Sequence, residues 1–139
     1  MKLLVCGSRR SFSYRALVWS KLDEWYANKK AMSPKDKGFE LEIIEGCCQY
    51  SADRYAEEWA KINNIKCNHY PANGKPLLRN IQMLKDCDSV IAFWDFWSYG
   101  TSFVISRATA MKKPITIIRI ERGVEVIEKI DKGEFVGEL

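Results

Sequence analysis

Residues 88–120, with the sequence DSVIAFWDFWSYGTSFVISRATAMKKPITIIRI, decide the fold. The mostly apolar run 89–93 is typical of a strand that is buried on both faces of a parallel sheet. Thr101 can cap the helix that follows, and Pro114 forces that helix to end before a second strand at 115–120. The stretch therefore predicts a strand, a loop, a helix and a further strand in succession.

The loop between this first strand and the helix, residues 94–101, is the first candidate for a binding site. Such a loop lies beside a helix N-terminus, where free N–H groups and the positive end of the helix dipole favour an anion. A phosphate-bearing small molecule is therefore the expected ligand. The loop also carries aromatic side chains on which a base can stack or a neighbouring subunit can pack, namely Trp94, Phe96, Trp97 and Tyr99.

Upstream of this unit, apolar periodicity and turn residues predict three more strands and three more helices. The expected strands are residues 2–6, 40–45 and 65–70, and the expected helices are residues 13–27, 51–62 and 77–85. Strands and helices alternate through five strands, which predicts a single Rossmann-like three-layer α/β/α domain with a mainly parallel five-stranded sheet. In the usual strand order the ligand site lies between the first and fourth strands, so residues 7–9 should lie next to the aromatic loop.

The end of the chain is harder to assign. The domain is expected to span residues 1–120, and residues 121–139 form a C-terminal extension that packs on the domain or on a partner subunit. The first apolar residues of this extension have helical spacing, whereas residues 131–133 could instead turn a hairpin. Both structures stay open for this segment.

The composition is that of an ordinary globular domain, with 47% hydrophobic and 29% charged residues among 139. It excludes a disordered chain, and the mild formal charge of +4, spread over scattered basic residues, argues against a long nucleic-acid track. No segment approaches the roughly twenty apolar residues of a membrane span, and the N-terminal apolar run is too short for a signal peptide. We therefore expect a cytoplasmic protein without membrane or extended nucleic-acid contacts.

Five cysteines without a CxxC pair, together with a single histidine, are a poor set of metal ligands. We expect a reduced protein that holds neither a metal nor a cofactor. The adjacent Cys47 and Cys48 are interpreted as buried free thiols in preference to a redox centre, because the sequence places no clear basic neighbour beside them. His69 lies inside a predicted strand and is interpreted as a hydrogen-bonded structural residue.

Four separated motifs, in order and at comparable spacing, resemble the SLOG superfamily, and within it the small YspA-like type of bacteria and their phages. They are GSRR at 7–10, EGCCQYSADRYAEEWA at 45–60, YPANGKPLLRNIQML at 70–84 and the stretch at 88–118. The resemblance implies a Rossmann-like fold and a nucleotide or nucleotide-derived ligand. It also implies two kinds of activity, since some members cleave N-glycosidic bonds and others are thought to sense or sequester nucleotide signals in conflicts between bacteria and phages.

The resemblance further implies which residues bind the ligand. The matching positions are Gly7, Arg9, Gly46, Asp53, Arg54, Arg79, Asn80, Ser98, Gly100 and Thr101. Arg9 and Arg79 suit phosphate on chemical grounds as well, because a guanidinium group offers a planar fork to phosphate oxygens. A surface ion pair is the alternative for either arginine. Ser8 and Trp94 complete the candidate set, the first as a phosphate ligand and the second as a stacking platform.

The chain departs from the family where catalysis is concerned. The hydrolases carry a glutamate three or four residues after the Gly-Thr pair, and Val104 and Ile105 stand at these positions here. Asp95 is the nearest substitute carboxylate, although a solvated or capping role in the loop is the preferred interpretation. Glu45 and Asp53 are further candidates, and Asp53 falls where a helix N-terminus favours an anionic cap.

Three functions stay open. The leading hypothesis is a protein that binds a nucleotide derivative without cleaving it, such as a phage protein that sequesters a host immune signal, because capture needs no catalytic carboxylate. The second is an N-glycosidic hydrolase or transferase that uses Asp95. The third is an oligomeric adaptor that binds no ligand. A homo-oligomer is expected because so many large aromatic side chains are hard to bury in one small domain.

Overall fold

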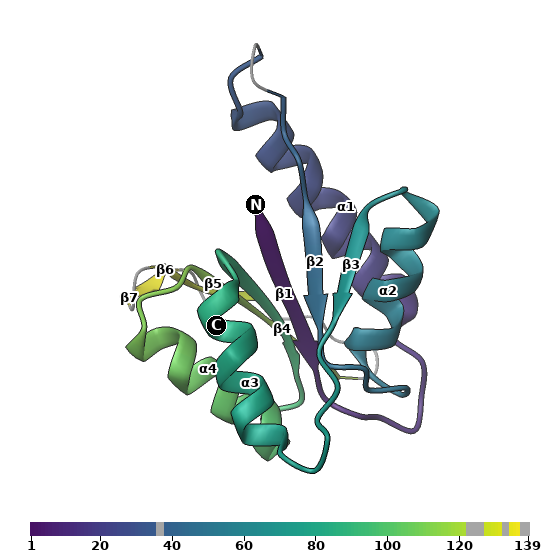
Figure 1. The fold of residues 1–139 in the computed structure, drawn as a ribbon, viewed down its shortest axis with the longest axis vertical. Coiled ribbons are helices and arrows are strands. Elements are labelled where there is room, and N and C mark those ends of the chain that lie inside the picture. The colour runs from purple at the N-terminus through teal and green to yellow at the C-terminus, as the bar shows by residue number, and fades with distance from the viewer. Residues whose placement is uncertain (36–37, 122–126, 132–133, 137–139) are drawn as a thin grey trace.

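One sheet runs through the molecule, in a computed structural model that describes residues 1–139 except 36–37, 122–126, 132–133 and 137–139 (Figure 1). Within these described residues the strand order is β3-β2-β1-β4-β5-β6-β7. The parallel strands are β1 (Lys2–Gly7), β2 (Glu42–Glu45), β3 (Lys66–His69), β4 (Ser89–Trp94) and β5 (Ile115–Arg119). The helices are α1 (Arg15–Met32), α2 (Ala52–Ile62), α3 (Pro76–Asp86) and α4 (Tyr99–Ala110). This architecture confirms the predicted Rossmann-like α/β domain.

Two hydrophobic cores fill the two faces of the sheet. The core under α1 and α2 includes Val18, Leu22, Ala56 and Trp59. The core under α3 and α4 includes Met83, Leu84, Val104 and Ala108. Within β1, Leu3 belongs to the first core and Leu4 to the second, because successive side chains of a strand point to opposite faces. The central strands are thus buried on both sides, as their apolar sequence predicts.

The strand order reverses between β1 and β4, which pair in parallel from Leu3↔Ser89 to Gly7↔Phe93. Beyond the last pair, the N–H of Ser8 donates to the carbonyl of Phe93 at 2.8 Å, so the two loops start side by side. The chain then leaves β1 toward α1 on one face and leaves β4 toward α4 on the other. This is the kind of switch point where open α/β sheets bind ligands.

Two helices differ from their predicted bounds. α1 continues to Met32, since its last turn carries Lys29 and Lys30, which suit the negative end of the helix dipole. α4 begins at Tyr99 with Ser98 as its N-cap, so the prediction that Thr101 caps this helix is wrong. Among the described residues, none of the helices combines the length and apolar character that a membrane crossing requires.

The sheet continues past β5 through an antiparallel hairpin of β6 (Ile127–Asp131) and β7 (Glu134–Val136), drawn in yellow in Figure 1. β6 pairs with β5 in the register Ile115↔Ile130. The hairpin alternative is confirmed for these residues, and the helical one is wrong, because pairing with the edge of β5 satisfies backbone groups of β6. The domain boundary at residue 120 stays a prediction.

Candidate functional site

A pocket of about 400 Å³ lies at the carboxyl ends of the parallel strands, at the lower end of the sheet in Figure 1. It brings together most of the predicted ligand-binding residues: Gly7, Ser8, Arg9, Asp53, Arg79, Asn80, Ser98, Gly100 and Thr101. The remaining lining residues are Cys6, Cys48, Met83, Tyr99 and Val104. Segments that are far apart in the sequence therefore meet at the switch point.

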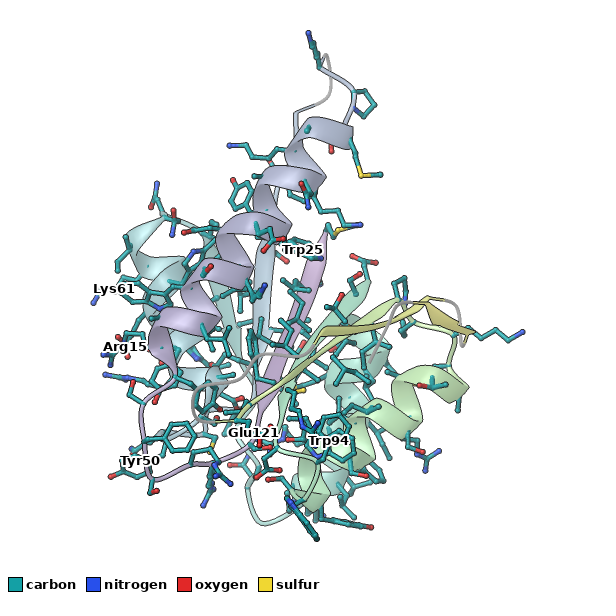
Figure 2. All side chains as sticks on the ribbon, turned by 180° about the vertical axis from the view of Figure 1, so that it is seen from behind. Arg15, Trp25, Tyr50, Lys61, Trp94 and Glu121 are labelled. Atoms are coloured by element: carbon teal, nitrogen blue, oxygen red, sulfur yellow. The ribbon has the colours of Figure 1, made fainter. Side chains whose placement is uncertain are left out.

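The structure places three predicted ligand-binding residues, Gly46, Arg54 and Trp94, outside this lining. Arg54 lies on the exposed side of α2, where it forms ion pairs with Glu57 at 3.7 Å and Glu58 at 3.4 Å. Trp94 stacks on the next aromatic side chain of its loop, with ring centroids 4.4 Å apart, and its indole N–H donates to the carbonyl of Ser98 at 3.1 Å. Figure 2 labels Trp94 at the end of the sheet that holds the pocket.

Gly46 lies behind the pocket wall, where the absence of a side chain is needed. A Cβ at this position would lie 2.7 Å from Nη1 of Arg79 and 3.1 Å from Oδ2 of Asp53. The residue therefore lets an arginine and a carboxylate approach the backbone closely. These two contacts within the protein account for a glycine at this position.

Asp95 organises the loop between β4 and α4. Its carboxylate accepts hydrogen bonds from the N–H of Trp97 at 2.9 Å, the N–H of Ser98 at 2.8 Å and the hydroxyls of Ser8 and Ser98 at 3.1 Å. Arg10 forms an ion pair with it at 3.4 Å. Burial tends to raise the pKa of Asp95, but these hydrogen bonds outweigh it and hold the pKa below its usual value. The side chain is only 8% exposed, so it caps the loop and is not solvated.

Tyr14 is a structural residue of the site that the sequence analysis did not single out. Its hydroxyl donates to the carbonyl of Ser8 and accepts the N–H of Ala52 at 2.9 Å. Burial is the main reason why its pKa is raised. Tyr14 thus joins the loop after β1 to the N-terminus of α2. Residue spacing along the chain does not predict this contact.

Arg79 of α3 connects this helix with the loops after β2 and β3. Its Nε donates to Oδ1 of Asn80 at 2.8 Å, and its Nη1 donates to the carbonyls of Gly46 and Tyr70. The acceptors in these bonds are carbonyl and amide oxygens and not carboxylates. The alternative role of a surface ion pair therefore does not apply to Arg79. Within the described part of the chain, Nη2 has no hydrogen-bond partner and stays available at the pocket.

Arg9 connects the loops after β1 and β2. Its Nε donates to Sγ of Cys48 at 3.0 Å, and the residue is otherwise exposed. Its two terminal nitrogen atoms have no partner among the residues that the structure describes. The pocket therefore carries two guanidinium groups whose outer N–H groups can meet an anion.

Asp53 is a carboxylate in the pocket lining, and it is only 7% exposed. Its Oδ2 accepts the N–H groups of Gly46 and Cys48, each at 3.1 Å. The predicted capping role is corrected, because Ser51 is the N-cap of α2 and Asp53 reaches back from the first turn to the preceding loop. Burial raises the pKa of Asp53 to about 6, although the hydrogen bond from Cys48 and the charge of Arg79 oppose the rise.

Glu45 lies beside this loop and is fully buried. Its carboxylate bonds to Nδ1 of His69 and accepts the N–H of Cys47 at 2.7 Å. Burial raises the pKa of Glu45 against the effect of both partners. His69 is hydrogen-bonded, as predicted. The prediction of buried thiols is wrong for Cys47, which is exposed because the chain turns there with a φ of 66°, and Cys48 is half-buried.

Comparison with known proteins gives one finding. A family model described as YAcAr, the YspA, cpYpsA-related SLOG family, matches residues 1–75. The matched part contains β1 to β3, with the loop that carries Ser8 and Arg9 and the helix α2 that carries Asp53, whereas Arg79 and the loop before α4 follow it. Neither the curated proteins nor the solved structures gave a match.

Proposed function

Because the chain belongs to the YspA, cpYpsA-related SLOG family, we propose that its pocket binds a nucleotide-derived small molecule by a phosphate group and does not cleave it. Membership of this family suggests a nucleotide-related ligand or glycosidic chemistry. The observation that carries the proposal is the convergence of Arg9, Arg79 and the N-terminus of α4 on one pocket of about 400 Å³. This volume lies in the usual range of small-molecule sites.

The N-terminus of α4 supplies backbone donors for the phosphate. The first bond of the helix runs from the N–H of Ser102 to the carbonyl of Ser98 at 3.1 Å, so the N–H groups of residues 99–101 stand outside the helical ladder. At Gly100, no described atom lies within 4 Å of the position that a Cβ would take. A phosphate can therefore approach this backbone closely, as anions do at helix N-termini.

The two arginines supply the positive charge. Arg79 is held in place by Asn80 and by two backbone carbonyls, so little side-chain entropy is lost when its outer N–H groups bind an oxygen. Arg9 is more exposed and can close on the ligand from the loop after β1. Guanidinium forks match the geometry of phosphate oxygens.

Tyr99 is the aromatic side chain best placed to stack on a base. It lines the pocket and is 72% exposed, whereas Trp94 is already stacked on Phe96. Base–aromatic stacking is worth about 1–3 kcal/mol per base. We therefore assign the stacking role to Tyr99 in place of Trp94.

The lining explains why binding is proposed without cleavage. Val104, which is 2% exposed, stands in the pocket at a position where the related hydrolases carry glutamate. Asp95 has both carboxylate oxygens committed to the loop, so it has no free oxygen for a substrate. A phage protein that withdraws a host immune signal would need capture of this kind and no turnover.

Titration calorimetry tests the binding proposal with nucleoside monophosphates, cyclic nucleotides and ADP-ribose-type nucleotides as probes. We expect one of these classes to bind. Arg9→Ala should weaken its binding affinity by about tenfold or more, because one charge-assisted contact is lost. Arg54→Ala is the matched control, because this arginine lies outside the pocket lining. Equal affinity for wild type and Arg9→Ala, or an equal loss in Arg54→Ala, would contradict the proposed site.

N-glycosidic cleavage is the second candidate, and one observation favours it: Asp53 lies in the pocket lining with a pKa raised to about 6, near the range that suits acid–base work. Chromatography of the ligand after incubation separates the two functions. Intact ligand supports capture. Free base or ribose phosphate, formed by the wild type and lost in Asp53→Asn, would replace the binding proposal with the enzymatic one.

A further inference from the structure

A second cluster of chemically active side chains lies at the carboxyl ends of β2 and β3. Glu45, Cys67 and His69 bring one ligand atom each within 4.8 Å of one another. Strand geometry explains the cluster, because Glu45 pairs with His69 across the two strands and Cys67 lies two residues before His69 on the same face of β3. Three groups of metal-ligand type therefore converge on one point.

Cys47 adds a fourth donor from the loop above. Its Sγ lies 3.9 Å from Oε1 of Glu45. Its φ of 66° is a left-handed conformation that glycine adopts readily and that costs other residues about 1 kcal/mol or more. A pocket of about 190 Å³ opens at this place, with Glu45, Cys47 and His69 in its lining.

The fully buried carboxylate of Glu45 is the negative charge that a cation would meet in this cluster. Glu57 also lines the small pocket, together with Arg54, and these two side chains form an ion pair at 3.7 Å, so their charges offset each other. A divalent ion would be attracted by the carboxylate of Glu45 and by the thiolates that it binds.

We propose that Glu45, Cys47, Cys67 and His69 form a binding site for a divalent transition-metal ion of the zinc type. Two sulfur atoms, one imidazole nitrogen and one carboxylate oxygen form a donor set that suits Zn²⁺ in tetrahedral coordination. Bond lengths of about 2.0–2.3 Å require the donors to be roughly 3.3–3.8 Å apart. The separation of 3.9 Å between Cys47 and Glu45 is close to this range, and the ion would take the place of the hydrogen bond between Glu45 and His69, with rotation of the side chains.

The ion would also stabilise one wall of the nucleotide pocket. Cys47 lies between Gly46, whose carbonyl accepts Nη1 of Arg79, and Cys48, whose sulfur accepts Nε of Arg9. A metal bond to Cys47 would therefore hold the loop to which both arginines are attached. The metal proposal does not depend on the identity of the nucleotide.

Titration of the chelator-treated, reduced protein with Co²⁺ and Zn²⁺ tests the site. We expect one Co²⁺ per chain, with a thiolate-to-cobalt charge-transfer band and intense visible bands of tetrahedral type, and displacement by Zn²⁺. Affinity should rise with pH, since both thiols must lose a proton to bind the ion. Zn²⁺ should also raise the melting temperature, and a chelator should reverse this rise.

Variants show which residues bind. Cys67→Ser and His69→Gln should each weaken Co²⁺ binding by more than about tenfold. Loss of a residue that only hydrogen-bonds a metal ligand already costs about this much, so loss of a ligand itself should cost more. Cys87→Ser is the matched control, because this cysteine lies outside the small pocket and does not belong to the proposed ligand set, and the variant should bind like the wild type. Circular dichroism without metal checks that each variant folds. An absence of stoichiometric binding by the wild type at micromolar protein, or an equal loss in Cys87→Ser, would overturn the proposal.

Discussion

The phenol oxygen of Tyr14 accepts the backbone N–H of Ala52 at 2.9 Å and donates its own hydrogen to the carbonyl of Ser8. One side chain just before α1 thereby connects the loop after β1 with the first turn of α2. Ala52 and Ser8 are buried, so water cannot easily replace the hydroxyl. This bridge positions two sides of the pocket relative to each other.

Tyr14→Phe should lower the free energy of unfolding by about 2–3 kcal/mol, because it leaves one buried donor and one buried acceptor without a partner. Urea denaturation measures this change. Tyr50→Phe is the control, since Tyr50 is 69% exposed and lies at the surface in Figure 2, and its stability should equal that of the wild type. Wild-type stability in Tyr14→Phe would show that the bridge contributes nothing.

Gly46→Ala should weaken nucleotide binding by about tenfold, because the new Cβ would displace the guanidinium of Arg79 and the carboxylate of Asp53. We also expect a loss of about 1–3 kcal/mol of stability from overpacking. Calorimetry and thermal melting measure the two effects. Gly100→Ala separates them, since its Cβ meets open space and should weaken phosphate binding without loss of stability. Unchanged binding and stability in Gly46→Ala would refute the packing argument.

Asp53 should make stability depend on pH. Its pKa in the folded protein is about 6, above its ordinary value of 3.8, so the folded state binds more protons than the unfolded state between these pH values. The contribution of Asp53 is therefore most favourable below pH 4 and is lost as the pH rises through 6, a change of about 3 kcal/mol. Urea denaturation at pH 4 to 7 should show that the free energy of unfolding of the wild type falls, relative to that of Asp53→Asn, as the pH rises. A difference between the two proteins that does not change with pH would contradict the raised pKa.

Asp95→Ala should destabilise the protein by about 1–2 kcal/mol, the usual cost of a lost cap. Because its hydrogen bonds hold the pKa of Asp95 below the ordinary value, this stabilisation is present near neutral pH and disappears as the pH falls below about 4. Thermal melting at two pH values measures it, with Met32→Ala as the control, since Met32 is 78% exposed. A variant as stable as the wild type at pH 7 would return Asp95 to the list of candidate catalytic residues.

A homo-oligomer stays a prediction, and the exposed aromatic residues Trp97 and Tyr99 give it a specific test. Large exposed aromatic side chains in one loop are favoured at protein contacts. Light scattering should give a mass of two or more chains, and Trp97→Ser should shift the equilibrium toward the monomer. A wild-type protein that is monomeric at high micromolar concentration would exclude the oligomer. If Trp97→Ser leaves the monomer–oligomer equilibrium unchanged, the interface lies elsewhere.

The cluster of Glu45, Cys47, Cys67 and His69, for which we propose a metal, shows where sequence reasoning stopped. The cysteine spacing and the single histidine led to the expectation that no metal is held, because the sequence shows only local spacing. Glu45 and His69 meet only through the register of β2 and β3, and Cys47 approaches them only because of its left-handed backbone. Neither the register nor the backbone angle can be read from residue types alone.

The sequence by itself determined the five parallel strands, their helices and the position of the switch point, because apolar periodicity and turn residues act locally along the chain. Only the tertiary structure decided which side chains enter the pocket: Tyr99 lines it and Trp94 does not, and Arg54 lies outside it. The physical reason is that spacing assigns a side chain to a face of its element, whereas its neighbours depend on how that element is placed against segments far away in the chain.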